Sequence, residues 1–311
     1  MPAHPDYMET EEMTKRDIKV VTDGLTYLEG PRWHQGALWF VDFYTYGVYR
    51  VNPDGSAEKV AHVEQQPSGL GWLPDGRMLV VSMKDRKVLR QEKDGSLVVH
   101  ADIWDQCAGH ANDMVVAPSG NAYVGNFGYD LMGGAPHKNT TLVLVRPDGS
   151  SQVVADGLAF PNGMVVTPDQ KRLIVNELFG NRISQFDIKA DGTLGPRRDF
   201  ANYGELGDEG DVGKRIERAT ILPDGLALDA EGAVWFADTI HQRAVRMAEG
   251  GKILDEVHTA PDGIFAVGLG GADGKTLFMC AAPDWDEAKR TVAREGRMLA
   301  TTVAVGHAGT P

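Results

Sequence analysis

Short apolar strands recur along this chain, and each is bounded by polar turns rich in Gly, Asp and Pro. The strands are β-branched and aromatic: LWFVD at 38–42, MLVVS at 78–82, AYVGN at 122–126, RLIVNE at 172–177, VWFAD at 234–238 and TLFMC at 276–280. Their starts are spaced by roughly 40 to 60 residues, a period typical of propeller blades. The pattern therefore predicts a circular array of similar units.

Most periods contain four strands in the same order. A polar residue, often followed by Gly, opens an apolar strand (SGLGWL, NDMVVA, NGMVVT, DGLALD), and a turn such as Pro-Asp-Gly leads to the strand named above. A third strand and a shorter, more polar fourth strand follow. Four strands in each of six units predict an all-β fold, a six-bladed β-propeller with four-stranded blades. One or two open β-sandwiches are the alternative, although sandwiches do not usually repeat an in-phase polar opener.

The last period lacks a fourth strand of its own. We predict that MLATTVAV at 298–305 pairs with DIKVVTD at 17–23, so that an N-terminal strand closes the ring in the last blade. Residues 1–17 are predicted to be a flexible lead-in, and 18–311 a single domain. Only 286–295 has helical composition.

Charge and composition exclude several classes of partner. Asp and Glu total 44 against 31 Lys and Arg, a net charge of -13, and no run of basic residues occurs. Nucleic acid and anionic membranes are therefore poor partners, and a small molecule is expected. No apolar stretch reaches the roughly 18 residues of a membrane span, and the acidic N-terminus lacks the features of an export signal, so we expect a cytoplasmic protein.

The two cysteines, Cys107 and Cys280, have neither CxxC nor zinc-finger spacing. A disulfide framework and a structural zinc site are therefore not expected, while one long-range bridge between them stays open.

Four polar residues occupy the same place in the repeat, about ten positions before a second strand: Glu29, Asn112, Asn162 and Asp224. The innermost strand of each propeller blade lines the central channel, so the four openers should converge there. Two carboxylates and two amide oxygens suit one divalent cation. Calcium is the expected ion, with magnesium, manganese or zinc as alternatives.

The remaining openers are weaker ligands. Blade two offers Ser68, and blade six has apolar side chains near Phe265, which leaves one sector of the ring open. An Asn or Asp before Gly, as at Asn162 and Asp224, is most often a turn former, but four polar openers in phase, with Asn112 and Glu29, favour a shared site. Asp113 is a candidate anchor behind the site, or simply a turn residue.

The strings LEGPRW, HANDMVVAPSG, FPNGMVV and LPDGLALDAEGAVWFAD resemble the senescence marker protein/gluconolactonase/luciferin-regenerating enzyme family, which includes regucalcin-like lactonases. The resemblance covers roughly residues 18–308. It implies that Glu29, Asn162 and Asp224 bind a divalent metal, that Asn112 contacts metal or substrate, and that Asp224 doubles as general base. It also implies hydrolysis of lactone or ester bonds.

One position departs from this pattern. Many sugar-lactone members carry an Arg two residues before the third-blade Asn, where this chain has His110. The side chains expected around the channel mouth are largely aromatic or apolar, which favours a non-sugar substrate. As substrate-binding residues we predict His110, Asn112, Tyr44, Phe127, Phe179 and His241, with Phe43, Met83, Phe160 and Trp285 near the same mouth.

Two insertions border this mouth. The Gly-rich segment 126–139 suits a lid, and the acidic segment 202–218 is expected to be a rim loop.

The sequence thus predicts a metal-dependent hydrolase in which a channel cation polarises a carbonyl, with Asp224 and Asn112 as catalytic residues. No GxSxG elbow or strand-associated GxGxxG occurs, so serine-hydrolase and nicotinamide chemistry are not expected. A non-catalytic ligand- or protein-binding propeller with a structural calcium remains an alternative. Phosphotriester hydrolysis or isomerisation at the same site is another.

Overall fold

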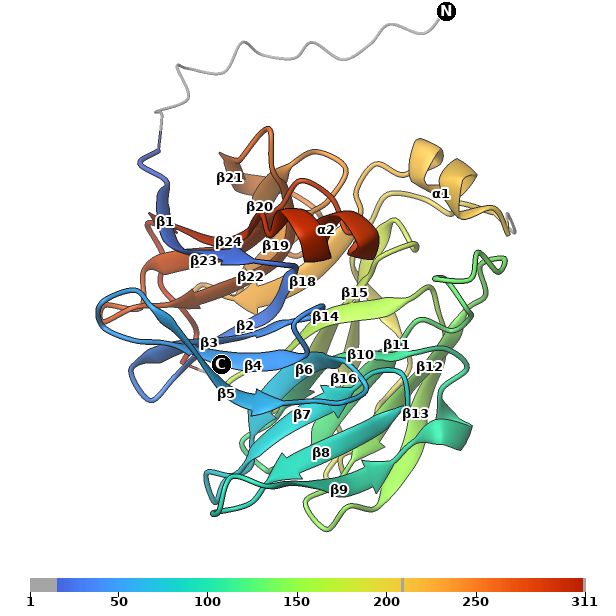
Figure 1. Cartoon of the computed structure of the whole chain (residues 1–311). Coiled ribbons are helices and arrows are strands. Elements are labelled where there is room, and N and C mark those ends of the chain that lie inside the picture. Colours follow the sequence, from blue (N-terminus) through green and yellow to red (C-terminus); the bar gives the residue numbers. More distant parts are fainter. Residues whose placement is uncertain (1–15, 208–209, 310–311) are drawn as a thin grey trace, which may run out of the picture.

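The computed structural model describes residues 16–207 and 210–309, whose strands form six four-stranded antiparallel sheets. Figure 1 shows these sheets arranged as the blades of a propeller. The predicted six-bladed β-propeller is therefore confirmed. The prediction of a flexible lead-in falls mostly on residues 1–15, which lie outside the described residues.

The first three blades follow one another along the chain. Blade 1 contains β2 (Leu28–His34), β3 (Ala37–Asp42), β4 (Gly47–Val51) and β5 (Ala57–His62). Blade 2 contains β6 (Pro67–Trp72), β7 (Met78–Ser82), β8 (Lys87–Gln91) and β9 (Leu97–Asp102). Blade 3 contains β10 (Ala111–Val116), β11 (Ala122–Asn126), β12 (Thr140–Val145) and β13 (Ser151–Leu158).

The last three blades complete the ring. Blade 4 contains β14 (Pro161–Val166), β15 (Arg172–Glu177), β16 (Arg182–Asp187) and β17 (Arg198–Asn202). Blade 5 contains β18 (Pro223–Leu228), β19 (Val234–Asp238), β20 (Arg243–Met247) and β21 (Ile253–His258). Blade 6 contains β22 (Gly263–Gly270), β23 (Thr276–Ala282), β24 (Gly296–Thr302) and β1 (Lys19–Leu25).

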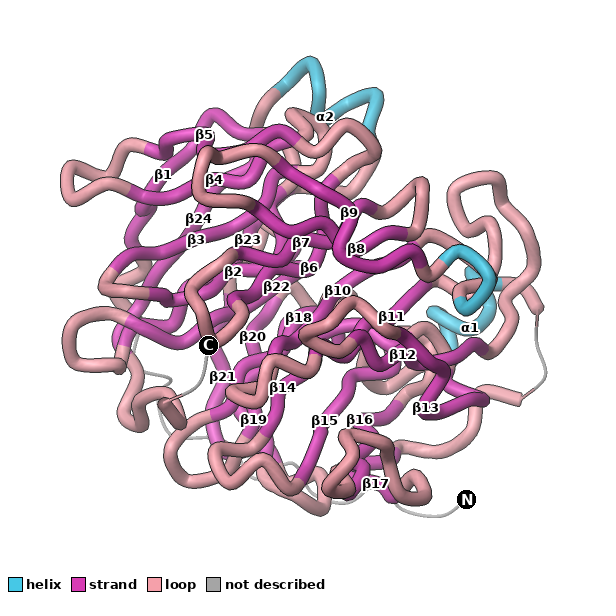
Figure 2. Tube along the Cα trace, turned by 90° about the horizontal axis from the view of Figure 1, so that it is seen from below, coloured by secondary structure: helices cyan, strands magenta, loops and turns pink. Residues whose placement is uncertain are grey.

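The ring closes as the sequence predicts. Strand β1 pairs antiparallel with β24, with Lys19 opposite Ala300 and Val20 opposite Leu299. Just before β1, the Arg16 guanidinium lies 2.5 Å from the Asp255 carboxylate. The N-terminal strand is thus the outer strand of the last blade. Figure 2 shows the first strands of successive blades gathered around the centre of the molecule.

A β-bulge interrupts each innermost strand at the opener or just after it. The ladder between first and second strands shifts register around the opener in five blades, for example between Ala111 and Met114 in blade 3 and between Pro161 and Met164 in blade 4. In blade 1 the shift comes just after the opener, between Glu29 and Arg32. A bulge re-aims the side chain of the extra residue. In blades 2 to 6 the bulge therefore takes the opener out of the regular alternation of side chains between the two faces of the strand.

Glycines after the openers allow neighbouring inner strands to touch. A Cβ on Gly163 would lie 2.4 Å from the Leu226 nitrogen, and one on Gly225 would lie 2.5 Å from the Ala266 Cα. A Cβ on Gly69 would lie 2.2 Å from the Met114 nitrogen. These glycines lie within strands and provide close backbone approach, which brings the openers of adjacent blades together.

Two short α-helices lie in connecting segments of the described chain. Helix α2 (Glu287–Ala293) confirms the helical composition predicted for 286–295. Helix α1 (Val212–Arg218) corrects the expectation that 202–218 is only a loop. The Asp211 carboxylate caps α1 by accepting from the Lys214 backbone N–H at 3.1 Å, a local signal that the acidic composition obscured. Neither helix has the length and apolar character needed to cross a membrane.

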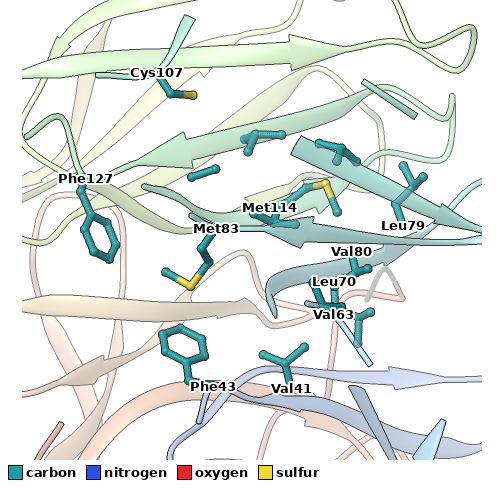
Figure 3. Packing of buried hydrophobic residues seen from close by; sticks show 14 of the residues in the cluster. Val41, Phe43, Val63, Leu70, Leu79, Val80, Met83, Cys107, Met114 and Phe127 are labelled. Atoms are coloured by element: carbon teal, nitrogen blue, oxygen red, sulfur yellow. The ribbon is translucent and has the colours of Figure 1, made fainter. Parts of the chain in front are cut away.

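Apolar side chains fill the space within and between blades. Figure 3 shows part of the largest cluster, in which Val41, Val63 and Leu70 pack around the blade 1 to blade 2 boundary. Cys107 and Cys280 are both buried and free, so the bridge left open by the sequence is not formed.

Candidate active site

The four predicted openers meet in one cavity. Glu29, Asn112, Asn162 and Asp224 all line a space of about 380 Å³ at the end of the inner strands. Each is buried or nearly so, and each comes from a different blade. The bulges and close glycine contacts described above bring together side chains that lie far apart in sequence.

Hydrogen bonds hold the openers in place. The Ser68 hydroxyl donates to Asn112 Oδ1 at 3.1 Å, so the opener of blade 2 supports the opener of blade 3. The side-chain amide of Asn176 donates to the Asp224 backbone oxygen at 2.6 Å. The Gly30 N–H lies 3.4 Å from Glu29 Oε2. Hydrogen bonds from nearby residues thus hold three of the four openers.

The two carboxyl groups share a strongly unfavourable environment for negative charge. Burial raises the pKa of Glu29 well above its ordinary value, and the charges of Asp224 and Asp113 raise it further. Burial and then the Asp113 charge also raise the pKa of Asp224, while hydrogen bonding from Asn162 lowers it. A nearby cation would relieve this charge repulsion.

One atom of this set lacks a partner within the protein. Asp224 Oδ1 is buried and accepts no hydrogen bond. An unpaired buried carboxylate oxygen is costly, and coordination of a cation is one way to satisfy it. Within the described residues no three His, Cys, Asp or Glu side chains cluster as a metal site, so a cation here would depend on the two amides as well.

Asp113 does not face the cavity but forms a buried ion pair. Its Oδ1 lies 3.1 Å from Arg32 Nη2 and accepts the Met114 N–H at 2.8 Å. Arg32 Nη2 also donates to the Met114 carbonyl at 2.9 Å. Burial raises the pKa of Asp113, and Arg32 opposes this shift. Asp113 therefore anchors the strand that carries Asn112.

Carboxylates at the ends of second strands position the loops around the cavity. Asp42 accepts the Tyr27 N–H at 2.8 Å, and Glu177 accepts the Ala159 N–H at 2.8 Å. Asp238 accepts the Leu222 N–H at 3.2 Å. All three carboxylates are fully buried. They fix the segments that enter the inner strands and carry apolar lining residues.

Most of the predicted substrate-binding residues line the cavity. His110, Tyr44, Phe127 and Phe179 join the openers there. Burial lowers the pKa of His110, as do the charges of Lys84 and Arg86. The Tyr44 hydroxyl donates to the Trp285 carbonyl at 2.6 Å, which ties the blade 1 turn to the segment before α2.

His241 lies elsewhere. It is not among the lining residues, and its Nδ1 lies 2.8 Å from Asp238 Oδ2. Its neighbours Thr239, Ile240 and Gln242 line the cavity instead. The prediction placed the right turn at the mouth, but local backbone geometry determines which of its side chains points inward.

Several polar or aromatic lining residues were not predicted from the sequence, Tyr27 and Gln66 among them. Tyr27 precedes β2 and Gln66 precedes β6, and both line the cavity. Each lies two positions before an opener. Their shared position in the repeat, just before an inner strand, is the sequence signal for such lining residues.

Two predicted mouth segments overhang the cavity. Leu131 and Met132 come from the 126–139 insertion, and Val212 and Ile216 come from α1. Met132 and Trp285 are about half exposed, at 47% and 54%. The rim is thus apolar on several sides.

The fold and cavity define a six-bladed β-propeller with a polar site at the channel end and an apolar mouth. Residues 28–283 match the family model described as SMP-30/Gluconolactonase/LRE-like region. The chain belongs to this family.

Three similar proteins illustrate the range of relatives. Pentonolactonase XacC of Haloferax volcanii is 25% identical over 267 residues, covering 85% of this chain and 84% of that protein. Regucalcin of Xenopus laevis is 27% identical over 273 residues, covering 85% and 86%. The structure of a calcium-binding protein, regucalcin, from Agrobacterium tumefaciens has a TM-score of 0.75 at 19% identity, covering 96% and 97%.

Proposed function

We propose that this protein is a metal-dependent hydrolase of lactone or ester bonds that acts on a non-sugar, partly apolar substrate. Family membership and the relative named as a pentonolactonase support the reaction class. The observation that carries the proposal is the unpartnered, buried Asp224 Oδ1 in one cavity with Glu29, Asn112 and Asn162.

These residues fit a divalent cation. Glu29 and Asp224 supply charge, and Asn112 and Asn162 supply amide oxygens, so the donor set is all oxygen and suits calcium before zinc. The relative titled a calcium-binding protein supports the same choice of ion. When bound, the cation would polarise the substrate carbonyl and favour the negative charge that develops on its oxygen.

The remaining chemistry belongs to the side chains. The Asp224 carboxylate accepts a proton as a water oxygen attacks the carbonyl carbon. The carbon–oxygen bond of the ester then breaks, and the proton passes from Asp224 to the leaving oxygen. Asn112, held by Ser68, orients the carbonyl group. The apolar rim limits access of other water molecules to the site.

The test is chelator-sensitive hydrolysis. Metal-stripped protein receives calcium, magnesium, manganese or zinc, and proton release is followed with δ-valerolactone and phenyl acetate. Glu29→Gln and Asp224→Asn should each lower cation affinity and turnover, whereas Glu58→Gln on outer strand β5 should change neither.

Two outcomes would contradict the proposal. Cation binding that stabilises the protein without any hydrolysis would indicate a non-catalytic propeller with a structural calcium. Turnover of phosphotriesters, or isomerisation, in place of ester cleavage would keep the site and change the reaction.

A further inference from the structure

Aromatic side chains form two groups in the candidate active site. In the first aromatic wall, the Tyr27 ring centroid lies 4.8 Å from that of Phe265 and 5.3 Å from that of Phe43. In the second aromatic wall, the Phe160 centroid lies 4.5 Å from that of Phe127 and 5.5 Å from that of Phe179. All six side chains line the same cavity.

The two walls lie on opposite sides of the ring. The first comes from blades 1 and 6, and the second comes from blades 3 and 4. Inner strands contact one another in chain order around the ring, including β2 with β22, so blade 1 faces blade 4 and blade 6 faces blade 3. The openers line the same cavity as the two walls. Figure 3 shows Met83 of blade 2 between Phe43 and Phe127, one from each wall.

The charge of the residues that line the cavity is a second feature of the site. Among the described residues that line it there is neither Lys nor Arg. Asp284, at the mouth, already lies 3.1 Å from Arg290 Nε. An anionic group of the substrate that lies between the walls, away from the openers and their cation, would therefore be desolvated without a cationic side chain beside it, which is unfavourable.

We propose that the substrate is uncharged and carries an aromatic ring, which lies between the two aromatic walls while its carbonyl faces the openers. This inference rests on the proposed hydrolase function and narrows its substrate class. Ring contacts with both walls favour a planar aryl group over an aliphatic one. A polyhydroxylated lactone would place some of its hydroxyl groups against the two apolar walls, where they would lose hydrogen bonds with water.

Matched substrates test this inference directly. 3,4-Dihydrocoumarin and δ-valerolactone share a lactone ring and differ in the fused benzene ring. Phenyl acetate and 4-acetoxybenzoate differ by one carboxylate. With the calcium-loaded protein we expect kcat/KM for dihydrocoumarin to exceed that for δ-valerolactone and for gluconolactone by about tenfold or more. The kcat/KM for phenyl acetate should exceed that for 4-acetoxybenzoate by a similar factor.

Substitutions in the two walls test whether these side chains cause the preference for an aromatic substrate. Phe127→Leu and Phe265→Leu should each lower the dihydrocoumarin to δ-valerolactone ratio by about threefold to tenfold. Phe278→Leu removes a buried ring outside the cavity, stacked on Trp33, and should leave the ratio unchanged. Met83→Arg adds a cation between the walls and should raise relative activity toward 4-acetoxybenzoate.

The outcomes separate the two proposals. Faster cleavage of δ-valerolactone or gluconolactone than of dihydrocoumarin overturns the aromatic substrate and leaves the hydrolase intact. If no lactone or ester is cleaved with any cation, the hydrolase proposal fails. The affinities for dihydrocoumarin and δ-valerolactone, measured by calorimetry, then test whether the two walls bind an aromatic ring. Equal affinity for both compounds, or no detectable binding of either, rejects the aromatic substrate.

Discussion

Arg32 and Asp113 form a buried ion pair that joins blade 1 to blade 3 across the inner strand of blade 2. Their side chains are only 7% and 9% exposed, and Arg32 Nη2 lies 3.1 Å from Asp113 Oδ1. Arg32 lies three residues after Glu29, and Asp113 directly follows Asn112. The pair thus couples two strands that carry openers. Arg32 itself lines a smaller cavity with Pro31 and Trp33 rather than the candidate active site.

Arg32→Met should destabilise the protein by about 3 to 5 kcal/mol, because it leaves the Asp113 carboxylate buried without its partner. The free energy of unfolding in urea measures this change. The double variant with Asp113→Asn should recover much of the loss, since no buried charge remains.

The exposed pair of Arg50 and Glu58, 3.5 Å apart, provides the control. Arg50→Met should change stability by less than about 1 kcal/mol. Equal effects of the two Arg substitutions would show that the buried pair has no special role.

Ser68→Ala should weaken cation affinity or turnover by about tenfold, because Asn112 loses the hydrogen bond that orients its amide. Calorimetry with calcium and initial rates of ester hydrolysis measure the two quantities. Ser184→Ala also removes a buried hydroxyl that donates to a carboxylate, Glu177, but its partner is outside the cavity lining. Similar losses of turnover in both variants would attribute the effect to stability alone.

Gly225→Ala should cost about 1 to 3 kcal/mol, because the new Cβ would lie 2.5 Å from the Ala266 Cα and must push blades 5 and 6 apart. Cation affinity should fall as well, since Asp224 moves with this strand. At Gly195 a Cβ would meet its nearest atom at 3.5 Å, so Gly195→Ala is the matched control and should be tolerated. Chemical denaturation of both variants makes the comparison.

Calcium should stabilise the protein more at about pH 8 than at about pH 5. Burial raises the pKa of Glu29 and Asp224, so between the usual carboxyl pKa, about 4, and the raised values the folded state holds protons that the unfolded chain has released. Without a cation, the contribution of these two groups to folding stability therefore falls as pH rises through that window. Cation affinity rises over the same window, because binding needs ionised carboxylates.

Thermal melting with and without calcium at the two pH values measures this effect. Asp224→Asn should remove most of the pH dependence of the calcium-induced rise in Tm. An equal rise in Tm at both pH values for the unaltered protein would contradict the assignment of these carboxyl groups as ligands.

Periodicity predicted the blades, the ring closure and the four openers, because these depend on strand alternation and on the spacing of turns. The role of the glycines that follow the openers was not predicted. Gly163 and Gly225 were expected at the start of strands, but the close contact that they allow between neighbouring inner strands depends on the packing of the blades. The Arg32–Asp113 pair was missed because it joins residues 81 positions apart on different blades. His241 shows a related limit of sequence-based prediction. The turn lies at the cavity, but the neighbouring side chains of Ile240 and Gln242 line it in place of His241.

Because β1 pairs with β24, the candidate active site can form only late in synthesis of the chain. Strand β1 is the first strand of the fold, but it cannot pair until β24, the last strand, has been synthesised, because Lys19 pairs with Ala300. A nascent chain that has not yet released β24 has an open ring, in which the blade 1 and blade 6 walls of the cavity are not held together. Ligand binding is therefore expected to report completion of the chain, and a truncated product should lack it even when most of its blades are folded.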